Sequence, residues 1–399
     1  MPDTEIVVHD TENRGDMGDI DHDTVLRARV FLLGSGRLDL LGVLNAYRVL
    51  AEASPKAYRP KLVSHLLGLR FKDRRPQAVL PLAAEAVEAA RRIEPDDPAR
   101  ERLLYEALNI YQEALRGLGL RAEGRVACEE LAEVGGFTQL AAVLSEEGRF
   151  AEAVELDRRA AGEAEIEEPF FWRMVAWAAD LEAAGLHEEA VDVLGELMTR
   201  QDAPPAVPVW VRVQRSRLWE AAGRGAEAAT ARKEAMTELE ALAKADEQEK
   251  FYVWERWACL FLMSVRADEP APTPQSPMPP FGRHRGWSGE VERAYAEALP
   301  GLEATAARLR EAGRPAELVD LHRRITARVV RRERHQHRTP AALLGPHFDE
   351  GVELARRLTD DAPRLSRALT DRAAFLVAAG AHAAAHDDLA EAVALLDAR

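Results

Sequence analysis

The feature that most constrains this chain is a glycine that recurs with similar neighbours at fixed distances. Five positions carry it: Gly148, Gly185, Gly223, Gly313 and Gly380. Small residues stand seven positions before them, namely Ala141, Ala178, Ser216, Ala306 and Ala373. Large apolar residues stand four before, namely Leu144, Leu181, Trp219, Leu309 and Leu376. Mostly small residues stand five after, namely Ala153, Ala190, Ala228, Leu318 and Ala385. This agreement indicates one structural unit repeated along the chain.

The repeated pattern predicts a helical hairpin. Glycine ends the first helix because it adopts a left-handed backbone conformation at little cost. Small residues on both sides of the turn let two antiparallel helices approach closely, and the large residue fills the groove between them. A single hairpin cannot bury its own apolar face, so such hairpins must stack. We therefore predict an all-α fold, an α-solenoid of stacked antiparallel helix hairpins.

Composition and spacing are consistent with this fold. Aromatic residues make up only 6% of the chain, and alanine, leucine, glutamate and arginine favour helices over strands. The first three glycines are 37 and 38 residues apart, whereas the later steps of 90 and 67 leave room for further units. The stretch around Gly345 is a candidate for one of these. Upstream, Gly36 and Arg37 resemble another turn, and residues 61–131 predict hairpins whose turns do not register.

The chain divides into four segments by composition. Residues 1–22 are acidic and predict a flexible tail. Residues 23–265 and 290–399 predict two helical arrays. Between them, residues 266–289 contain six prolines, which exclude a helix. We expect this proline-rich linker or loop to be exposed, although such segments also serve as ligands for aromatic grooves.

Neither a signal peptide nor a membrane span is expected. The first residues lack a basic region followed by an apolar one. The longest apolar stretch, residues 251–265, is interrupted by Glu255 and Arg256 and is shorter than a bilayer requires. Its aromatic face, which includes Trp254 and Trp257, predicts core. These features favour a cytoplasmic protein.

The repeats resemble tetratricopeptide repeats (TPRs), well over residues 135–240, fairly over 297–399 and weakly before 135. The spacing is longer than that family's usual repeat of about 34 residues, and resembles longer-looped variants of bacterial regulators. The resemblance implies a superhelix whose concave groove is lined by the first helix of each pair, at positions thirteen, ten, six and three before each glycine. Those positions hold Trp172, Val175, Ala179 and Glu182 in one unit, and Trp210, Val213, Arg217 and Glu220 in the next.

The predicted groove lacks the Lys and Asn with which some TPR proteins clamp a terminal carboxylate. Its tryptophans and Arg217 would suit an apolar peptide or helix, since such residues anchor interfaces. A second interpretation stays open, in which Trp172 and Trp210 cover neighbouring helices.

An arginine-rich stretch follows near residue 330. The side chains of Arg324, Arg328, Arg331 and Arg332 fall three or four residues apart, or adjacent, and could form one cationic face on a helix. Such a face could meet an anionic partner, or it could pair with the acidic helices that this chain supplies. The sequence leaves both interpretations open.

No catalytic, metal or cofactor site is predicted. His382 and His386 lie four apart but lack the glutamate of a zinc-protease motif and a third ligand. Cys128 and Cys259 are far apart, and the glycines at 34–36 match no phosphate loop. The formal net charge of −15 disfavours nucleic acid and anionic lipid as partners.

These observations favour a non-catalytic, protein- or peptide-binding scaffold or adaptor with a regulatory role. One alternative is a ligand- or peptide-responsive sensor related to bacterial transcriptional regulators but lacking its own output domain, with a small molecule as a further candidate ligand. A second alternative is an enzyme of unrecognised type. The sequence does not indicate the partner or the oligomeric state.

Overall fold

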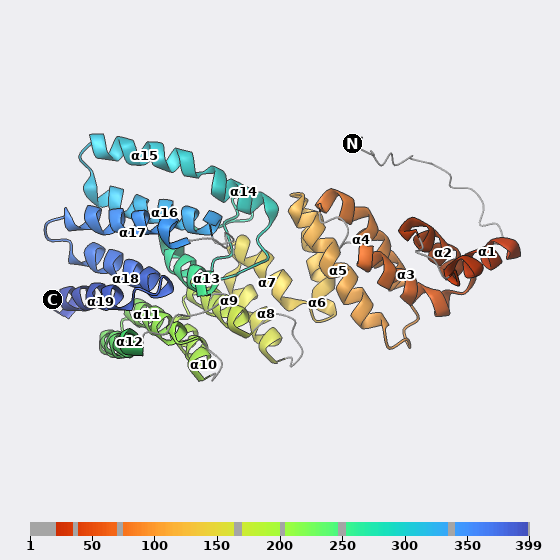
Figure 1. Ribbon diagram of the computed structural model, residues 1–399, viewed down its shortest axis with the longest axis horizontal. Coiled ribbons are helices and arrows are strands. Elements are labelled where there is room, and N and C mark those ends of the chain that lie inside the picture. Colours follow the sequence, from red (N-terminus) through yellow and green to blue (C-terminus); the bar gives the residue numbers. More distant parts are fainter. Residues whose placement is uncertain are drawn as a thin grey trace. The chain divides into compact units, whose positions relative to one another are not determined.

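A computed structural model describes residues 21–34, 39–69, 75–162, 170–199, 204–245, 253–333 and 340–397. Throughout these ranges the chain forms α-helices and two short 3-10 helices, without a strand (Figure 1). The all-α prediction is therefore confirmed. The chain splits into two compact units, with the boundary after Ala107.

The first unit consists of consecutive helices in which each packs on the next from α1 to α4. Its helices are α1 (His22–Leu32), α2 (Leu40–Ala53), α3 (Pro55–Leu69), α4 (Pro76–Arg91) and the beginning of α5 (Arg100–Gly117). A small core holds α1 and α2 together through Ala28, Ala46 and Leu50.

The second unit begins within α5 and contains the registered repeats. Its first helices are α6 (Arg121–Glu133), α7 (Phe137–Glu146), α8 (Phe150–Gly162), α9 (Phe170–Ala183), α10 (His187–Glu196), α11 (Ala206–Ala221), α12 (Gly225–Ala245) and α13 (Val253–Val265). Those that follow are α14 (Gly289–Glu297), α15 (Leu299–Glu311), α16 (Pro315–Glu333), α17 (Pro340–Arg356), α18 (Ala362–Ala378) and α19 (His382–Asp397). The 3-10 helices are η1 (Leu197–Thr199) and η2 (Arg266–Asp268).

All five predicted glycine turns are present. Each glycine follows a helix with a φ between 64° and 80°, the left-handed region that favours glycine. The next residue donates its N–H to the carbonyl four positions before the glycine, as Arg149 does to Leu144 over 2.9 Å. The corresponding distances in the other four turns are 2.8 to 3.0 Å. This bond is that of a Schellman motif, which ends the first helix of each hairpin.

The small residues on either side of the turns are buried, as predicted. Those seven positions before the glycines are at most 5% exposed, and those five after are at most 4% exposed. The large residues four before are less uniform. Leu144 and Leu181 are buried, whereas Trp219, Leu309 and Leu376 are half-buried. Close helix approach is thus the common property of the repeats.

Two further turns escaped the sequence pattern. Gly119 and Gly135 also have positive φ, and the residues after them donate to the carbonyls of Leu115 and Leu131 over 2.9 Å. The prediction of a unit centred on Gly345 is wrong, because this glycine lies inside α17. The suggested turn at Gly36 lies outside the described residues.

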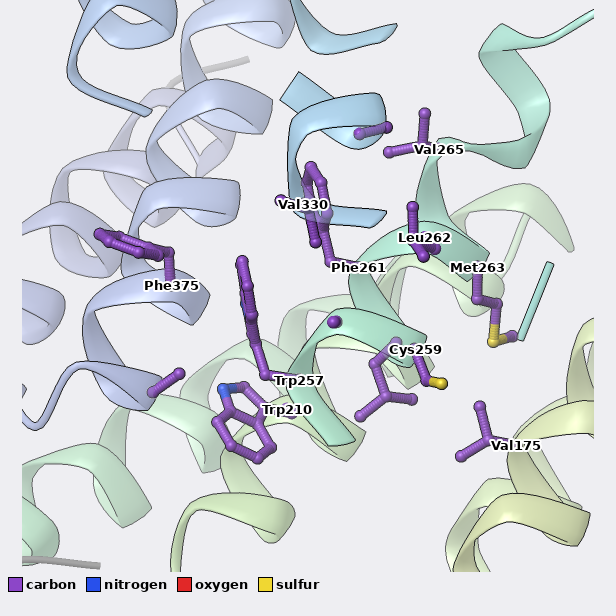
Figure 2. Close-up of a cluster of buried hydrophobic side chains, with 14 of the residues drawn as sticks. Val175, Trp210, Trp257, Cys259, Phe261, Leu262, Met263, Val265, Val330 and Phe375 are labelled. Carbon is purple, nitrogen blue, oxygen red and sulfur yellow. The ribbon is translucent and has the colours of Figure 1, made fainter. Parts of the chain in front are cut away.

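The second unit closes back on itself through its later helices. α19 packs on α12, α18 packs on α11, and α13 packs on α9, α11, α16 and α18 (Figure 1). α13 is therefore central, and Trp257, Phe261 and their neighbours pack against Phe348 and Phe375 (Figure 2). The core predicted for this stretch is confirmed over the described residues. The predicted domain boundaries at 22/23, 265/266 and 289/290 stay predictions.

In the described ranges, every helix is either too short or too polar to cross a membrane.

Candidate functional site

The predicted groove residues of α9 are covered by the chain itself. The proline-rich segment from Glu269 to Ser288, here called the strap, runs without a helix or strand from η2 to α14 (Figure 1). It lies on residues of α7, α8 and α9, here called the strap face: Thr138, Ala142, Asp157, Trp172, Val175, Ala179 and Asp180. The predicted groove positions of α9 lie together, but the segment that covers them belongs to the same chain.

Two neighbouring residues of the strap fit closely against α9. Gly282 has a φ of 86°, and a Cβ atom built on it would lie 2.5 Å from Cβ of Ala179 and 3.1 Å from the carbonyl oxygen of Val175. The His284 ring stacks on Trp172, with centroids 4.3 Å apart and planes at 20°. Only glycine therefore fits at the first position, and a flat ring covers Trp172 at the second.

Arg283 inserts its guanidinium between two buried carboxylates. Its Nη2 lies 2.9 Å from Oδ2 of Asp157 on α8 and 2.5 Å from Oδ2 of Asp180 on α9. The hydroxyl of Ser145 on α7 donates to the other oxygen of Asp180 over 2.6 Å. All three charged side chains are at most 5% exposed. One cation thus serves two anions, and burial raises the pKa of Asp157 well above its ordinary value.

This cluster predicts that the stability of Asp157→Asn, relative to that of the original chain, rises with pH. Because the pKa of Asp157 is raised in the folded chain, its contribution to stability is present below the unfolded value of about 3.9 and is lost as pH rises towards the folded pKa. Asparagine keeps the shape without the charge. The variant should match the original chain at low pH and become relatively more stable as pH rises, by about 1.4 kcal/mol for each unit separating the two pKa values.

Urea unfolding at several pH values measures this difference. The exposed Asp192→Asn on α10 is the matched control and should show no such trend. A stability difference between the Asp157 variant and the original chain that stays constant with pH would contradict the raised pKa.

A second buried ion pair anchors the end of the strap. Arg116 on α5 lies 3.2 Å from Glu146 on α7, with both side chains at most 6% exposed, and it also donates to the carbonyl of Gly286. Glu146 accepts from the backbone N–H of Ser288 over 2.6 Å. Burial raises the pKa of Glu146 in spite of the cation beside it.

Two expectations therefore need correction. The strap is exposed mainly in its first half, at residues 270, 271 and 273–276, whereas Phe281, Arg283, His284, Trp287 and Ser288 in its second half are all buried. Neither are the predicted α9 positions exposed, since Trp172, Val175, Ala179 and Glu182 are at most 9% exposed. The open alternative, in which Trp172 is covered by other parts of the chain, describes what is found. The local sequence gave no sign of this because the covering residues lie about 100 positions away.

The predicted groove residues of α11 line a cavity of about 1190 Å³. Trp210 forms part of its floor and is 2% exposed, with its Nε1–H donating to the carbonyl of Ala374 over 3.0 Å. Val213 and Arg217 are half-buried on its wall, and Glu220 is exposed at its edge. The exposed position expected for Trp210 is thus wrong, whereas the other three positions do face open space.

Arg217 connects the two predicted groove units. It binds Glu182 on α9 through both carboxylate oxygens, with Nη2 to Oε2 at 2.7 Å. Although burial alone would raise it, the charges of Arg217 and of Arg266 hold the pKa of Glu182 below its ordinary value. Glu182 therefore stays ionised behind the cavity wall.

The opposite wall carries a ladder of alternating charges, here called the ion ladder. It runs Arg364, Asp320, Arg367, Asp268, Arg323 and Asp371, with each neighbouring pair within 3.4 Å. The side chains come from η2, α16 and α18. Burial opposes it, but the hydrogen bonds from two arginines lower the pKa of Asp320. Asp320 therefore stays ionised at neutral pH.

Sequence reasoning missed this ladder. A signal was present in α18, where Arg364, Arg367 and Asp371 lie three and four residues apart and share one helix face. Their partner on η2 lies in the segment predicted as the proline-rich linker, residues 266–289, and their partners on α16 lie in a different hairpin, so no local pattern joins them.

The four arginines of α16 do not form one exposed cationic face. Arg328 binds Glu269 over 2.6 Å and lies 4.0 Å from the centre of the Tyr295 ring. Arg331 is buried 3.5 Å from the centre of the Trp287 ring and binds Glu292. Arg324 also pairs with Glu269, and it lines the cavity. Arg332 is mostly exposed beside Glu333. Pairing with acidic neighbours, one of the two open interpretations, accounts for these contacts.

The remaining candidates offer little chemistry. Cys128 and Cys259 are buried, and burial raises the pKa of Cys128 to about 11. His382 is buried and His386 is half-buried. Across the residues that the structure describes, no three histidine, cysteine or acidic side chains gather as metal ligands would.

Comparison with known proteins identifies no family. No protein-family model matches the chain, and no curated protein matches it. Among solved structures, one match is described as the "Structure of Naa15/Naa10 bound to HypK-THB". It is 13% identical, covers 90% of this chain and 62% of that chain, and has a TM-score of 0.28. The chain thus spans less than two thirds of that protein, and so weak a likeness says nothing about function.

Proposed function

We propose that this chain is a non-catalytic, TPR-like scaffold of the cytoplasm that binds a peptide segment of a protein partner in the cavity between α11 and α18. The observation that carries the proposal is the cavity of about 1190 Å³, whose walls include Val213, Arg217 and Glu220. The resemblance to tetratricopeptide repeats predicts that these three positions face a partner.

The size of the cavity favours a peptide. Pockets for small molecules and cofactors usually occupy roughly 300–1,000 Å³, and this one is larger. A peptide segment is large enough to fill a cavity of this volume.

The chemistry of the walls supports the same occupant. The ion ladder offers donors and acceptors in alternation, as a peptide main chain does. Beneath it, apolar side chains from α13 and α19, including Leu260, Leu389 and Val393, form a floor that can receive an aliphatic or aromatic side chain. Mixed polar walls over an apolar floor are the usual composition of a protein interface.

A second candidate function is that of a peptide-responsive sensor. The cavity lies between α11–α13 on one side and α15–α19 on the other, so an occupant contacts both sets of helices at once. An occupant that binds one arrangement of these sets better than another would shift the population between them. A change in helix packing on binding, measured by hydrogen exchange, separates this function from passive scaffolding.

Filling the cavity tests the proposal. Peptides are selected from a random displayed library against the intact chain, and their affinities are measured by calorimetry. Val213→Trp places a large ring in the cavity from a half-buried position and should weaken the selected peptides by at least about tenfold, or about 1.4 kcal/mol.

The matched control is Val126→Trp on α6, a 63% exposed position outside the cavity. This change should leave the affinities unchanged. Equal binding by both variants, or a selection that enriches no peptide, would argue against the cavity as the binding site.

A further inference from the structure

The strap has the character of a bound peptide. Within the strap, residues 270–288 form no helix or strand, and Pro279 and Pro280 favour an extended backbone. Its fixed points are aromatic and arginine side chains seated against other helices, which is how peptides and interface hot spots are anchored. A main-chain hydrogen bond joins it to the end of α7, where the N–H of Met278 donates to the carbonyl of Glu146 over 3.0 Å.

Three consecutive residues carry most of the recognition. Gly282 is required because a Cβ atom there would meet Ala179 at 2.5 Å. Arg283 is required because Asp157 and Asp180 are buried with it and need its charge. The ring of His284 lies flat on Trp172. The strap face is therefore complementary to the order glycine, arginine, flat ring.

The strap face takes none of its residues from the strap. Its acidic pair, its tryptophan and its small residues stand on α8 and α9, whose hairpins are held by their own glycine turns and buried alanines. The strap adds an arginine to a pocket that carries two carboxylates. A site with this charge and shape would accept the same sequence from another chain.

We propose that the strap face is a recognition site for a peptide containing glycine, arginine and a flat ring in that order, which the strap fills in cis and which a partner segment of this chemistry can fill in trans. The site is distinct from the cavity of the proposed function and does not depend on it. A tethered segment has a high effective concentration, so the strap holds the site until it is weakened. A partner must then outcompete it.

Complementation in trans tests the proposal with the intact chain. The variant Arg283→Ala removes the cis anchor, and the probe is a synthetic peptide spanning residues 276–289 with blocked ends. The peptide should bind this variant and raise its melting temperature as its concentration increases. It should bind the original chain at least about tenfold more weakly, because the strap competes.

Three variant peptides define the specificity. A peptide with Arg283→Ala should lose at least about tenfold in affinity, because the acid pair loses its cation. A peptide with Gly282→Ala should lose a similar factor, because its new Cβ atom would clash with Ala179. A peptide with Arg285→Ala is the matched control and should bind normally, since Arg285 is exposed in the strap.

A second chain covers the case in which Arg283→Ala does not fold. His284→Ala removes the ring on Trp172 and its contact with Glu255, 3.9 Å away, but leaves the acid pair with its arginine. This chain should therefore fold, and its weakened strap should also let the peptide bind. If the folded variants bind none of the peptides, or bind the Arg283→Ala peptide as well as the original, the strap is a fixed structural element and the proposal is overturned.

Discussion

Replacing Arg283 by alanine should lower the free energy of unfolding by about 3–5 kcal/mol, because it leaves Asp157 and Asp180 buried without a counter-charge. Both carboxylates are at most 4% exposed, so water cannot take the place of the guanidinium. All seven tryptophans lie in the second unit. Urea unfolding followed by tryptophan fluorescence therefore reports on the unit that contains the substitution.

Two companion variants distinguish this effect from general damage to the strap. Arg285→Ala, two residues away and exposed, should cost less than about 0.5 kcal/mol. Adding Asp157→Asn and Asp180→Asn to Arg283→Ala should recover much of the loss, because the buried charges are removed together. A loss below about 1 kcal/mol for Arg283→Ala alone would mean that the two carboxylates do not depend on this arginine.

The repeat could be predicted from the sequence because its determinants are local. A glycine, the carbonyl four residues before it and the alanines that flank the turn all lie within one hairpin, so Gly148 and its neighbours carry the whole pattern. The turn at Gly135 does not stand out in the sequence, because its local residues depart from this pattern. Gly136 follows it directly, and Leu140 rather than a small residue stands five positions after it.

The filling of the groove could not be predicted, because composition was a poor guide to burial. Six prolines predict an irregular segment, and that is correct, but an irregular backbone does not decide which of its residues are exposed. The second half of the strap is buried because its aromatic and arginine side chains, such as Phe281 and Arg283, find partners on helices far away in the sequence. The available signal was an acidic residue within a helix of a repeat, Asp157. Its carboxylate is buried in the structure and is paired with an arginine from far away in the sequence.

One wall of the cavity could be predicted from the sequence, and the opposite wall could not. The resemblance to tetratricopeptide repeats placed Val213, Arg217 and Glu220 on the face of one helix that lines a groove, and all three line the cavity. The opposite wall exists because α18 and α19 pack back on α11 and α12, and no short-range pattern encodes that closure. The same closure buries Trp210, which the resemblance to tetratricopeptide repeats assigned to the open side.

Replacing Trp210 by alanine should therefore destabilise the chain by about 3–5 kcal/mol, as for other buried aromatic residues. The indole is 2% exposed, and its N–H bonds to the carbonyl of Ala374, 164 residues away in the sequence. Its removal leaves a void beside Trp257 and breaks the hydrogen bond to Ala374, and both effects loosen α11 from α18.

Trp219→Ala is the matched control from the same helix. Trp219 is half-buried and lies 5.1 Å from the Arg224 guanidinium, so its loss should cost clearly less than that of Trp210, about 1 kcal/mol. Because an open groove and a closed core predict opposite results for Trp210, the comparison decides between them. If Trp210→Ala kept full stability while the selected peptides lost their affinity, Trp210 would be a partner contact on an open face. A large loss of stability places it in the core that joins the two sides of the cavity.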